Sequence, residues 1–374
     1  MRVLHVAQPT HGGLVRCVAD PVRDQILRGW DVHVASPPEG ELPGLVRAAG
    51  AAHVAWPAAR SPGPGVPRET ERLRKIVDAV RPDIVHLHSS KAGLCGRLAL
   101  RGRLPTVFQP QAWSFHAAAG PLRWAAATWE RLGARWAHAV VCASEAEREQ
   151  GEGVGIRARW RVIYNGVDVQ RLSAAGEEER RAARGRLGLA ADPIAVCVGR
   201  LSRQKGQDVL LDAWPEVTRS VPDGLLVLVG SGEAREPLEA RGVAGVVFAG
   251  ERDDVPDWLA AADVVVNASR WEGMSLAILE AMARGRSVVA TDVAGSREAL
   301  GAEAGAIVPP EDPAALATEI AKRFADPGLR EAEGGAARER ALRFHDVRRT
   351  TAQVAELYEE LVGAARTNTR VCGG

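Results

Sequence analysis

Short apolar runs alternate with longer segments of helical periodicity along most of the chain. Each run is rich in Val, Ile, Leu or Ala, and a helix-like stretch follows it. This alternation is typical of parallel sheets covered by helices on both faces, because a strand buried on both sides needs continuous apolar sequence. One series of predicted strands lies near 2–7, 31–35, 83–87, 105–108 and 139–142, and a second lies near 194–198, 225–229, 245–248, 263–266, 287–290 and 305–308.

A polar, Arg/Glu-rich segment from Gly176 to Arg186 separates the two series. We therefore predict an α/β protein with two Rossmann-like, doubly wound domains, at 1–170 and 171–344. A helix near 345–365 and a flexible tail at 366–374 would complete the chain. Ligands of such sheets bind at the carboxyl ends of the strands, so two facing domains predict a site in the cleft between them.

Composition adds a few exclusions to this picture. The formal net charge of +1 gives no reason to expect a nucleic-acid partner. The cysteines form no Cys-x-x-Cys pair and the histidines show no metal-ligand spacing, so we expect no metal cofactor. A strand begins at Arg2 with no signal peptide before it, and no apolar run approaches the length of a membrane span. We therefore expect a cytoplasmic protein.

Two glutamates stand around a predicted strand–loop–helix transition. Glu272 precedes Gly273 shortly after the apolar run 264–266, and Glu280 lies inside an apolar helix that begins at Ser275. Such a loop delivers a helix N-terminus to the carboxyl end of a strand, where backbone N–H groups favour an anion, and Ser275 can cap the helix. Alone, the pair has a simpler explanation: an arginine partner for Glu280 and a solvated loop charge at Glu272.

Two cations follow the predicted strand 194–198. Arg200 and Lys205 bracket a loop between glycines, which suits a diphosphate bound by a bidentate guanidinium and a point charge. The alternative is a pair of solvated loop charges.

Gly12 and Gly13, after the first strand, would likewise let the backbone approach a ligand or would simply form a tight turn. Neither Gly-x-Gly-x-x-Gly after the first strand nor a P-loop is present, which disfavours a dinucleotide oxidoreductase and a P-loop nucleotidase.

One predicted helix, from Gly120 to Val140, carries Trp124, Trp129 and Trp136 among arginines. A helix of this composition can dock on an anionic lipid surface. The alternative, which we favour from the sequence, is that the tryptophans pack on the sheet while the arginines face water.

Four motifs in register make the chain resemble a known family. They are Gly12-Gly13 after the first strand, Asn165-Gly166-Val167-Asp168, Gly199-Arg200 with Lys205-Gly206, and Glu272-x7-Glu280. Over about residues 2–362 the chain resembles the retaining nucleotide-sugar glycosyltransferases of family 4, the group-1 glycosyl transferases with the GT-B fold. The resemblance implies a donor nucleotide held mainly by the second domain and an acceptor held mainly by the first. It also implies that the C-terminal helix returns to the first domain.

The resemblance implies roles for single residues. Arg200 and Lys205 would bind the donor diphosphate and neutralise it as it leaves. Glu272 would lie near the transferred sugar, and Glu280 would accept hydrogen bonds from the ribose hydroxyls. The other implied donor-binding residues are Gly12 and Gly13 over the phosphates, Gly273, Met274, Ser275 and Leu276 with backbone N–H groups toward the sugar and phosphate, and Gly250 and Arg252 beside the base.

The sequence departs from the family pattern after the strand that ends near Phe108. The family usually has a histidine followed by glycine there, whereas this chain has Gln111-Ala112, and its nearest histidine is His116. Glutamine can donate a hydrogen bond to a sugar hydroxyl but cannot act as a general base. Gln111, His116 and His88, which ends another predicted strand, are our candidates for residues near the acceptor or the sugar.

The resemblance, together with the absence of metal-ligand spacing, therefore implies a retaining, metal-independent glycosyltransferase that moves a hexose from a UDP- or GDP-type sugar to an acceptor hydroxyl. A role in cell-surface polysaccharide or lipid-linked glycan synthesis, with peripheral membrane contact through 120–138, is the first choice. The alternatives are glycosylation of a small soluble natural product such as an aminocyclitol antibiotic precursor, a sugar-nucleotide epimerase, and a non-catalytic carbohydrate-binding protein.

Overall fold

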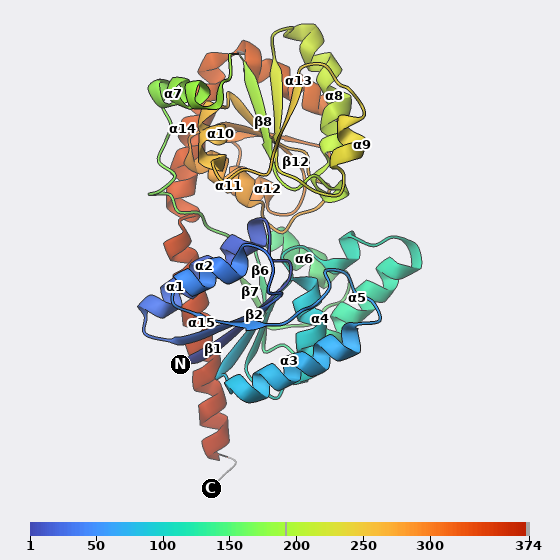
Figure 1. The fold of residues 1–374 in the computed structure, drawn as a ribbon, viewed down its shortest axis with the longest axis vertical. Helices are drawn as coiled ribbons and strands as arrows, with labels where there is room; N and C mark the ends of the chain where they lie inside the picture. The colour runs from blue at the N-terminus through green and yellow to red at the C-terminus, as the bar shows by residue number, and fades with distance from the viewer. Residues whose placement is uncertain (191–192, 372–374) are drawn as a thin grey trace. The chain divides into compact units, whose positions relative to one another are not determined.

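The computed structural model describes residues 1–190 and 193–371, and the chain divides into two compact units (Figure 1). The first unit comprises Met1–Asn165 and the C-terminal segment from Arg348 onward, and the second comprises Gly166–Val347. Each unit is a parallel sheet covered by helices, so the predicted α/β class with two doubly wound sheets is confirmed. The break between the units follows Asn165, whereas the sequence places it after residue 170.

The first unit contains a seven-stranded parallel sheet in the order β3-β2-β1-β4-β5-β6-β7. The chain order reverses between β1 and β4, which makes this pair the switch point where ligands of such sheets bind. The strands are β1 Arg2–Ala7, β2 Asp31–Ser36, β3 Ala52–Ala55, β4 Ile84–His88, β5 Thr106–Gln109, β6 Ala139–Cys142 and β7 Trp160–Val162.

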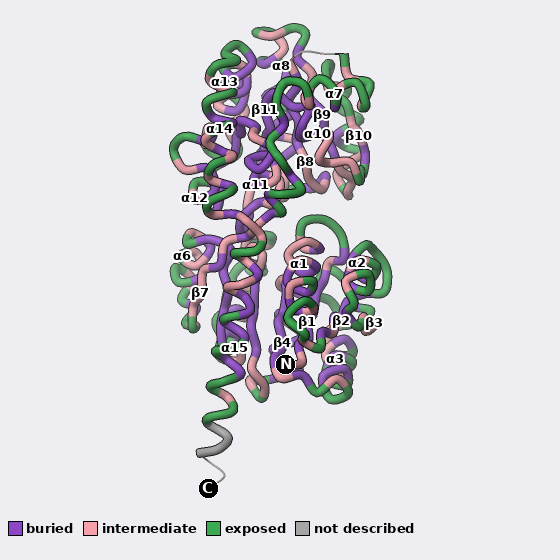
Figure 2. Tube along the Cα trace, turned by 90° about the vertical axis from the view of Figure 1, so that its left-hand side faces the viewer, coloured by how far each residue is buried: buried purple, intermediate pink, exposed green. Residues whose placement is uncertain are grey.

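Helices cover both faces of this first sheet. Successive residues of β1 point to opposite layers, because side chains alternate along a strand. Leu4 packs in the core beneath α3 and α4, whereas Val3 packs in the core formed with α15. Figure 2 shows the strands β1 and β4 buried, with exposed residues on the surrounding helices and loops. The helices are α1 Gly13–Leu27, α2 Leu42–Ala48, α3 Val66–Val80, α4 Ser89–Leu100, η1 Ser114–His116, α5 Gly120–Ala134, α6 Glu145–Gly153 and α15 Val347–Val371.

The second unit contains a six-stranded parallel sheet in the order β10-β9-β8-β11-β12-β13. Its switch point lies between β8 and β11. The strands are β8 Ile194–Val198, β9 Leu225–Val229, β10 Val246–Gly250, β11 Val264–Asn267, β12 Ser287–Thr291 and β13 Gly305–Val308. The helices are α7 Glu177–Leu187, η2 Arg203–Lys205, α8 Gln207–Ser220, α9 Arg235–Glu239, α10 Val255–Ala261, α11 Leu276–Ala283, α12 Ser296–Leu300, α13 Pro313–Ala325 and α14 Pro327–Phe344.

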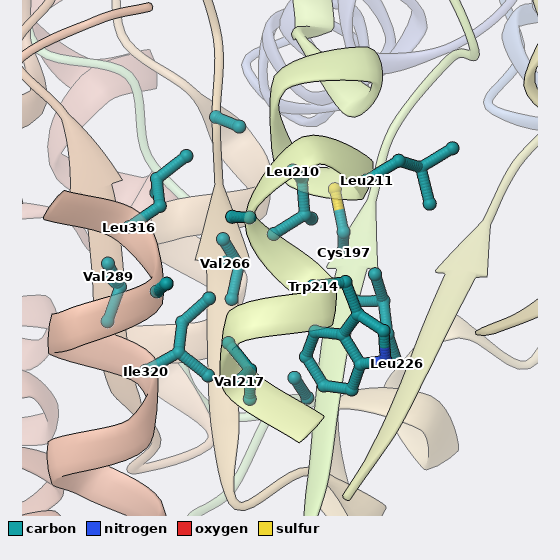
Figure 3. Packing of buried hydrophobic residues seen from close by; sticks show 14 of the residues in the cluster. Cys197, Leu210, Leu211, Trp214, Val217, Leu226, Val266, Val289, Leu316 and Ile320 are labelled. Atoms are coloured by element: carbon teal, nitrogen blue, oxygen red, sulfur yellow. The ribbon is translucent and has the colours of Figure 1, made fainter. Parts of the chain in front are cut away.

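One apolar core of the second unit lies between the sheet and helices α8 and α13. Trp214 and Val217 from α8 pack with Ile320 from α13 over Val266 and Val289 of the sheet (Figure 3). Complete burial of such side chains contributes about 1.5–3 kcal/mol each. This packing fixes the sheet whose strand ends carry the predicted donor residues.

Some sequence-predicted boundaries differ from the structure. The apolar runs locate eleven of the strands, but β3 and β7 were missed. The predicted helix 120–140 ends at Ala134, because β6 begins at Ala139. Helix α15 continues to Val371, past the predicted end at 365, and residues 372–374 of the predicted tail lie outside the described residues.

Candidate functional site

The loops after β8 and β11 meet at the switch point of the second sheet, where they bring Lys205 and Glu272 together. The Lys205 ammonium forms an ion pair with Glu272 Oε1. The Ser269 hydroxyl also donates to Glu272 Oε1, at 2.7 Å. Glu272 is only 8% exposed, and a buried carboxylate needs such partners. The simpler explanation of Glu272 as a solvated loop charge is therefore wrong.

Gly206 makes this approach of the two loops feasible. Its φ is +65°, and a Cβ atom at this position would lie 2.0 Å from the carbonyl oxygen of Ala268, directly after β11. An L-residue would therefore meet both backbone strain and a clash. The absence of a side chain at Gly206 lets η2, which carries Lys205, lie against the loop of Glu272.

Arg200 is connected to the same loop pair through Gln204. Arg200 Nη2 donates to Gln204 Oε1 at 3.3 Å, and Gln204 Nε2 donates to the carbonyl oxygen of Trp271 at 3.0 Å. The backbone N–H of Arg270 donates to the Gln204 carbonyl oxygen at 2.7 Å. Gln204 thus links both predicted cations to the Glu272 loop. No sequence motif points to Gln204, because its role depends on which strands are neighbours in the sheet.

The predicted anion-binding helix α11 begins at Leu276, with Ser275 at its N-cap position. The prediction that the Ser275 hydroxyl caps this helix is wrong. That hydroxyl instead accepts a hydrogen bond from Asn267 Nδ2 at 3.1 Å, which ties it to the end of β11. Glu280 is half-buried in the second turn of α11.

The loop of Gly273 and Met274 is packed tightly from behind. Both residues are buried, and Gly295 approaches them so closely that a Cβ atom there would lie 2.4 Å from the Gly273 carbonyl oxygen. The backbone path that precedes α11 is therefore fixed by a second loop of the same unit.

Gly250 and Arg252 lie at and after the end of β10. Gly250 has a φ of +74°, and its carbonyl oxygen accepts from Gly230 N–H at 2.7 Å. Arg252 is exposed and pairs with Asp254 at 2.5 Å, with its guanidinium 5.9 Å from the ring centre of Trp258. The structure thus gives Arg252 a partner on its own loop.

In the first unit, the predicted Gly12 and Gly13 begin helix α1. Gly12 is the N-cap residue with a φ of +76°, and both glycines are exposed. The Gln111-Ala112 turn follows β5 with φ angles of +57° and +88°. His116 lies in η1, where its Nε2 pairs with Gln150 Oε1 at 3.0 Å.

His88 lies in the interior and not on a ligand-accessible surface. It is completely buried, and its Nε2 lies 2.9 Å from Nδ1 of His5, whose Nε2 pairs with Gln25 at 2.8 Å. Burial lowers the pKa of His5 to about 4 and that of His88 well below its usual value. Together with His86, which pairs with Tyr358 at 2.5 Å, these imidazoles form a neutral network between the sheet, α1 and α15.

Comparison with known proteins identifies the family that this chain matches. A model described as Glycosyltransferase Family 4 matches residues 11–171, and one described as Glycosyl transferases group 1 matches residues 192–326. The structure of HepE from Anabaena in complex with UDP and glucose superimposes with a TM-score of 0.81, over 96% of this chain and 99% of that chain, at 24% identity.

Two sequence relatives agree with this classification. EpsD of Bacillus subtilis, named as a glycosyltransferase, is 28% identical over 88% of this chain and 89% of its own length. The GDP-mannose-dependent alpha-(1-6)-phosphatidylinositol monomannoside mannosyltransferase of Mycolicibacterium smegmatis is 37% identical over 51% of this chain, which spans about half of that relative (54%). The chain belongs to the family 4, group-1 glycosyltransferases of the GT-B type, as the motifs predict.

Substitution of Gly206 by alanine should destabilise the second unit and weaken nucleotide-sugar binding. The left-handed backbone costs about 1–2 kcal/mol for an L-residue, and displacement of the crowded Ala268 carbonyl adds about 1–3 kcal/mol. Gly188→Ala is the matched control, because Gly188 has a φ of +66° but open space around its Cβ position. Urea unfolding should show the smaller cost for Gly188→Ala; equal costs would contradict the proposed close contact.

Proposed function

We propose that this protein transfers a hexose from a nucleoside-diphosphate sugar to an acceptor hydroxyl with retention of configuration. The observation that supports this most strongly is the convergence of Lys205, Glu272 and the start of α11 at the switch point of the second sheet. A diphosphate bound there would meet an ammonium group and the N-terminus of a helix. A sugar next to it would meet the Glu272 carboxylate, a hydrogen-bond acceptor.

The proposed mechanism relies on positioning and electrostatics. As the bond between C1 and the diphosphate oxygen lengthens, negative charge grows on the leaving phosphate and positive charge on the sugar. Arg200 and Lys205 stabilise the phosphate, which removes the need for a metal ion in that role. The acceptor hydroxyl attacks from the face that the phosphate leaves, and a phosphate oxygen takes its proton, so no enzymic nucleophile is required.

The nucleotide is proposed to be UDP or GDP. HepE was solved with UDP and glucose, and the mycobacterial relative is GDP-mannose-dependent by name. The preferred donor can therefore be identified by testing a panel of UDP- and GDP-hexoses as substrates. Release of the nucleoside diphosphate can be followed with water as the acceptor, so that the assay does not require the natural acceptor.

Lys205→Ala should lower the turnover of the preferred donor at least tenfold. Removal of the ammonium takes away one of the two charges that stabilise the leaving diphosphate, and it also leaves Glu272 without its cation. The measurement is steady-state release of the nucleoside diphosphate by a mutant whose melting curve shows a folded protein. Lys322→Ala is the control, because Lys322 is exposed on α13. Near-normal turnover of folded Lys205→Ala would contradict the proposal.

We further propose that α5 contacts an anionic membrane surface, as a lipid-linked acceptor would require. Within the described residues, no helix is both long and apolar enough to cross a membrane. On α5, however, Leu122 is 67% exposed and Trp124 is 69% exposed beside the exposed Arg123 and Arg131. The acid of this helix, Glu130, is buried against Arg97 at 2.7 Å. An exposed aromatic residue among cations fits the headgroup region of anionic lipids.

Trp129, which the sequence suggested for the same surface, is a poorer candidate. It is half-buried, and the Arg97 guanidinium lies 5.2 Å from its ring centre. The expectation that the tryptophans of this helix all pack on the sheet is wrong for Trp124, because one face of α5 points away from the core.

The protein should co-sediment with phosphatidylcholine vesicles that contain phosphatidylglycerol, and a higher salt concentration should weaken this binding. Trp124→Ala should reduce the bound fraction at least fivefold, since it removes the largest exposed apolar group of α5. Leu27→Ala, which removes an apolar residue of 82% exposure from α1, should leave binding unchanged. Absence of binding to anionic vesicles would instead favour a small soluble acceptor.

A further inference from the structure

Arg270 joins loops that follow neighbouring strands of the second sheet. It lies shortly after the end of β11 and before Glu272, and its side chain is only 12% exposed. Its Nη1 and Nη2 atoms donate to the two carboxylate oxygens of Asp208, at 2.8 and 2.7 Å. Asp208 lies in the first turn of α8, which follows the η2 turn that carries Lys205. The guanidinium therefore connects the loop after β11 with the loop after β8, and these strands are adjacent in the sheet.

The Arg270 guanidinium uses all of its N–H groups in this position. Nη1 also donates to the carbonyl oxygen of Arg203 at 2.8 Å. Nε and Nη2 donate to Glu311, which follows β13 and has a φ of +61°. A guanidinium carries five N–H donors in one plane, and each of them has an acceptor here. Such a side chain is held in one orientation, so Arg270 fixes the three loops against one another.

The backbone of Arg270 holds the η2 turn as well. Its N–H donates to the Gln204 carbonyl oxygen at 2.7 Å, and the Gln204 side chain donates to the Trp271 carbonyl oxygen at 3.0 Å. Lys205 follows Gln204 in the chain, and Glu272 follows Trp271. Each member of the ion pair is therefore next to a residue whose hydrogen bonds join the two loops.

The placement of the Lys205 ammonium depends on this support. Lysine is a flexible side chain, so the position of its charge depends on the backbone that carries it. A cation that stabilises a leaving group must lie where the negative charge develops. The Lys205 side chain is 20% exposed, whereas the turn that carries it is bound to the loop of Glu272 through Arg270. Arg270 can thus control where this charge lies without contacting a ligand itself.

We propose that Arg270 is a positioning residue of the nucleotide-sugar site, which fixes the η2 turn so that the Lys205 ammonium lies beside Glu272. This inference rests on the proposed function, because it gives Arg270 an effect on the reaction through Lys205. The guanidinium itself is occupied by protein acceptors and is not a ligand of the donor.

The test is a double-mutant cycle between Arg270→Lys and Lys205→Ala in donor hydrolysis. A lysine keeps the charge, but its three N–H donors lie on one nitrogen and cannot bind Asp208 bidentately while they also reach Arg203 and Glu311. In the wild-type background, Arg270→Lys should lower kcat/KM at least fivefold. In the Lys205→Ala background it should lower kcat/KM less than twofold, because the effects of residues that act as a unit are not additive. Where hydrolysis by Lys205→Ala is too slow to follow, the same cycle is measured with the affinity for the nucleoside diphosphate.

Two further variants separate positioning from general stability. Asp208→Asn replaces one carboxylate acceptor of Arg270 by an NH₂ group at the same size, and it should lower kcat/KM in the same pattern. This variant takes the place of Arg270→Lys in the cycle if Arg270→Lys does not fold. Arg219→Lys is the matched control, because Arg219 forms an exposed ion pair with Glu216 on the same helix α8. It should retain wild-type kinetics.

Amide hydrogen exchange gives a readout that needs no donor. Exchange in the segment 203–206 should accelerate at least fivefold in Arg270→Lys, because the η2 turn loses part of its support. It should stay unchanged in Arg219→Lys.

The outcomes distinguish this inference from the proposed function. A loss below fivefold in the wild-type background, or a loss above twofold in the Lys205→Ala background, would show that Arg270 does not act through Lys205. If wild-type protein hydrolyses none of the nucleotide sugars and binds no nucleoside diphosphate, the proposed function fails. In that case, unchanged exchange of the segment 203–206 in Arg270→Lys would separately overturn the support of the η2 turn.

Discussion

A buried carboxylate must be paired, and in the second domain Glu272 is paired with Lys205. The two residues belong to loops that follow β8 and β11, which are separated along the chain but adjacent in the sheet. The two loops can approach each other because Gly206 has no Cβ atom to clash with the Ala268 carbonyl oxygen. The Ser269 hydroxyl adds a second hydrogen bond to the Glu272 carboxylate. The chemistry proposed for the domain depends on this pair, because it places a cation and an anion side by side at the carboxyl ends of two neighbouring strands.

The first domain uses a different device at its corresponding edge. There, Gln111 and Ala112 both have positive φ angles, and the Ala112 N–H donates to the buried carboxylate of Glu147 at 2.7 Å.

Much of the fold could be predicted because parallel strands buried on both faces require apolar runs. The two strands that were missed, β3 and β7, are the edges of the first sheet. Edge strands are half solvated and short, so Ala52–Ala55 and Trp160–Val162 carry no continuous apolar run. His88 was misplaced for a related reason: its position at a strand end is visible in the sequence, but its burial against His5 is not.

In the candidate site, the residue types were predictable and their contacts were not. Lys205 and Glu272 are visible as parts of motifs, whereas their pairing depends on the spatial order of strands. Ser275 has the sequence of a helix cap, but Asn267 from the neighbouring strand end binds its hydroxyl.

The most direct test is the thermal melting of wild type and Glu280→Ala with UDP, GDP, ADP and TDP. A nucleotide that binds only the native state adds about 2.7 kcal/mol of stability at a hundredfold excess over Kd. We expect one nucleotide to raise the melting temperature of wild type, and Glu280→Ala to remove that shift while remaining folded. If no nucleotide shifts the wild-type melt at millimolar concentration, the assignment of the second domain as a nucleotide-sugar site is contradicted.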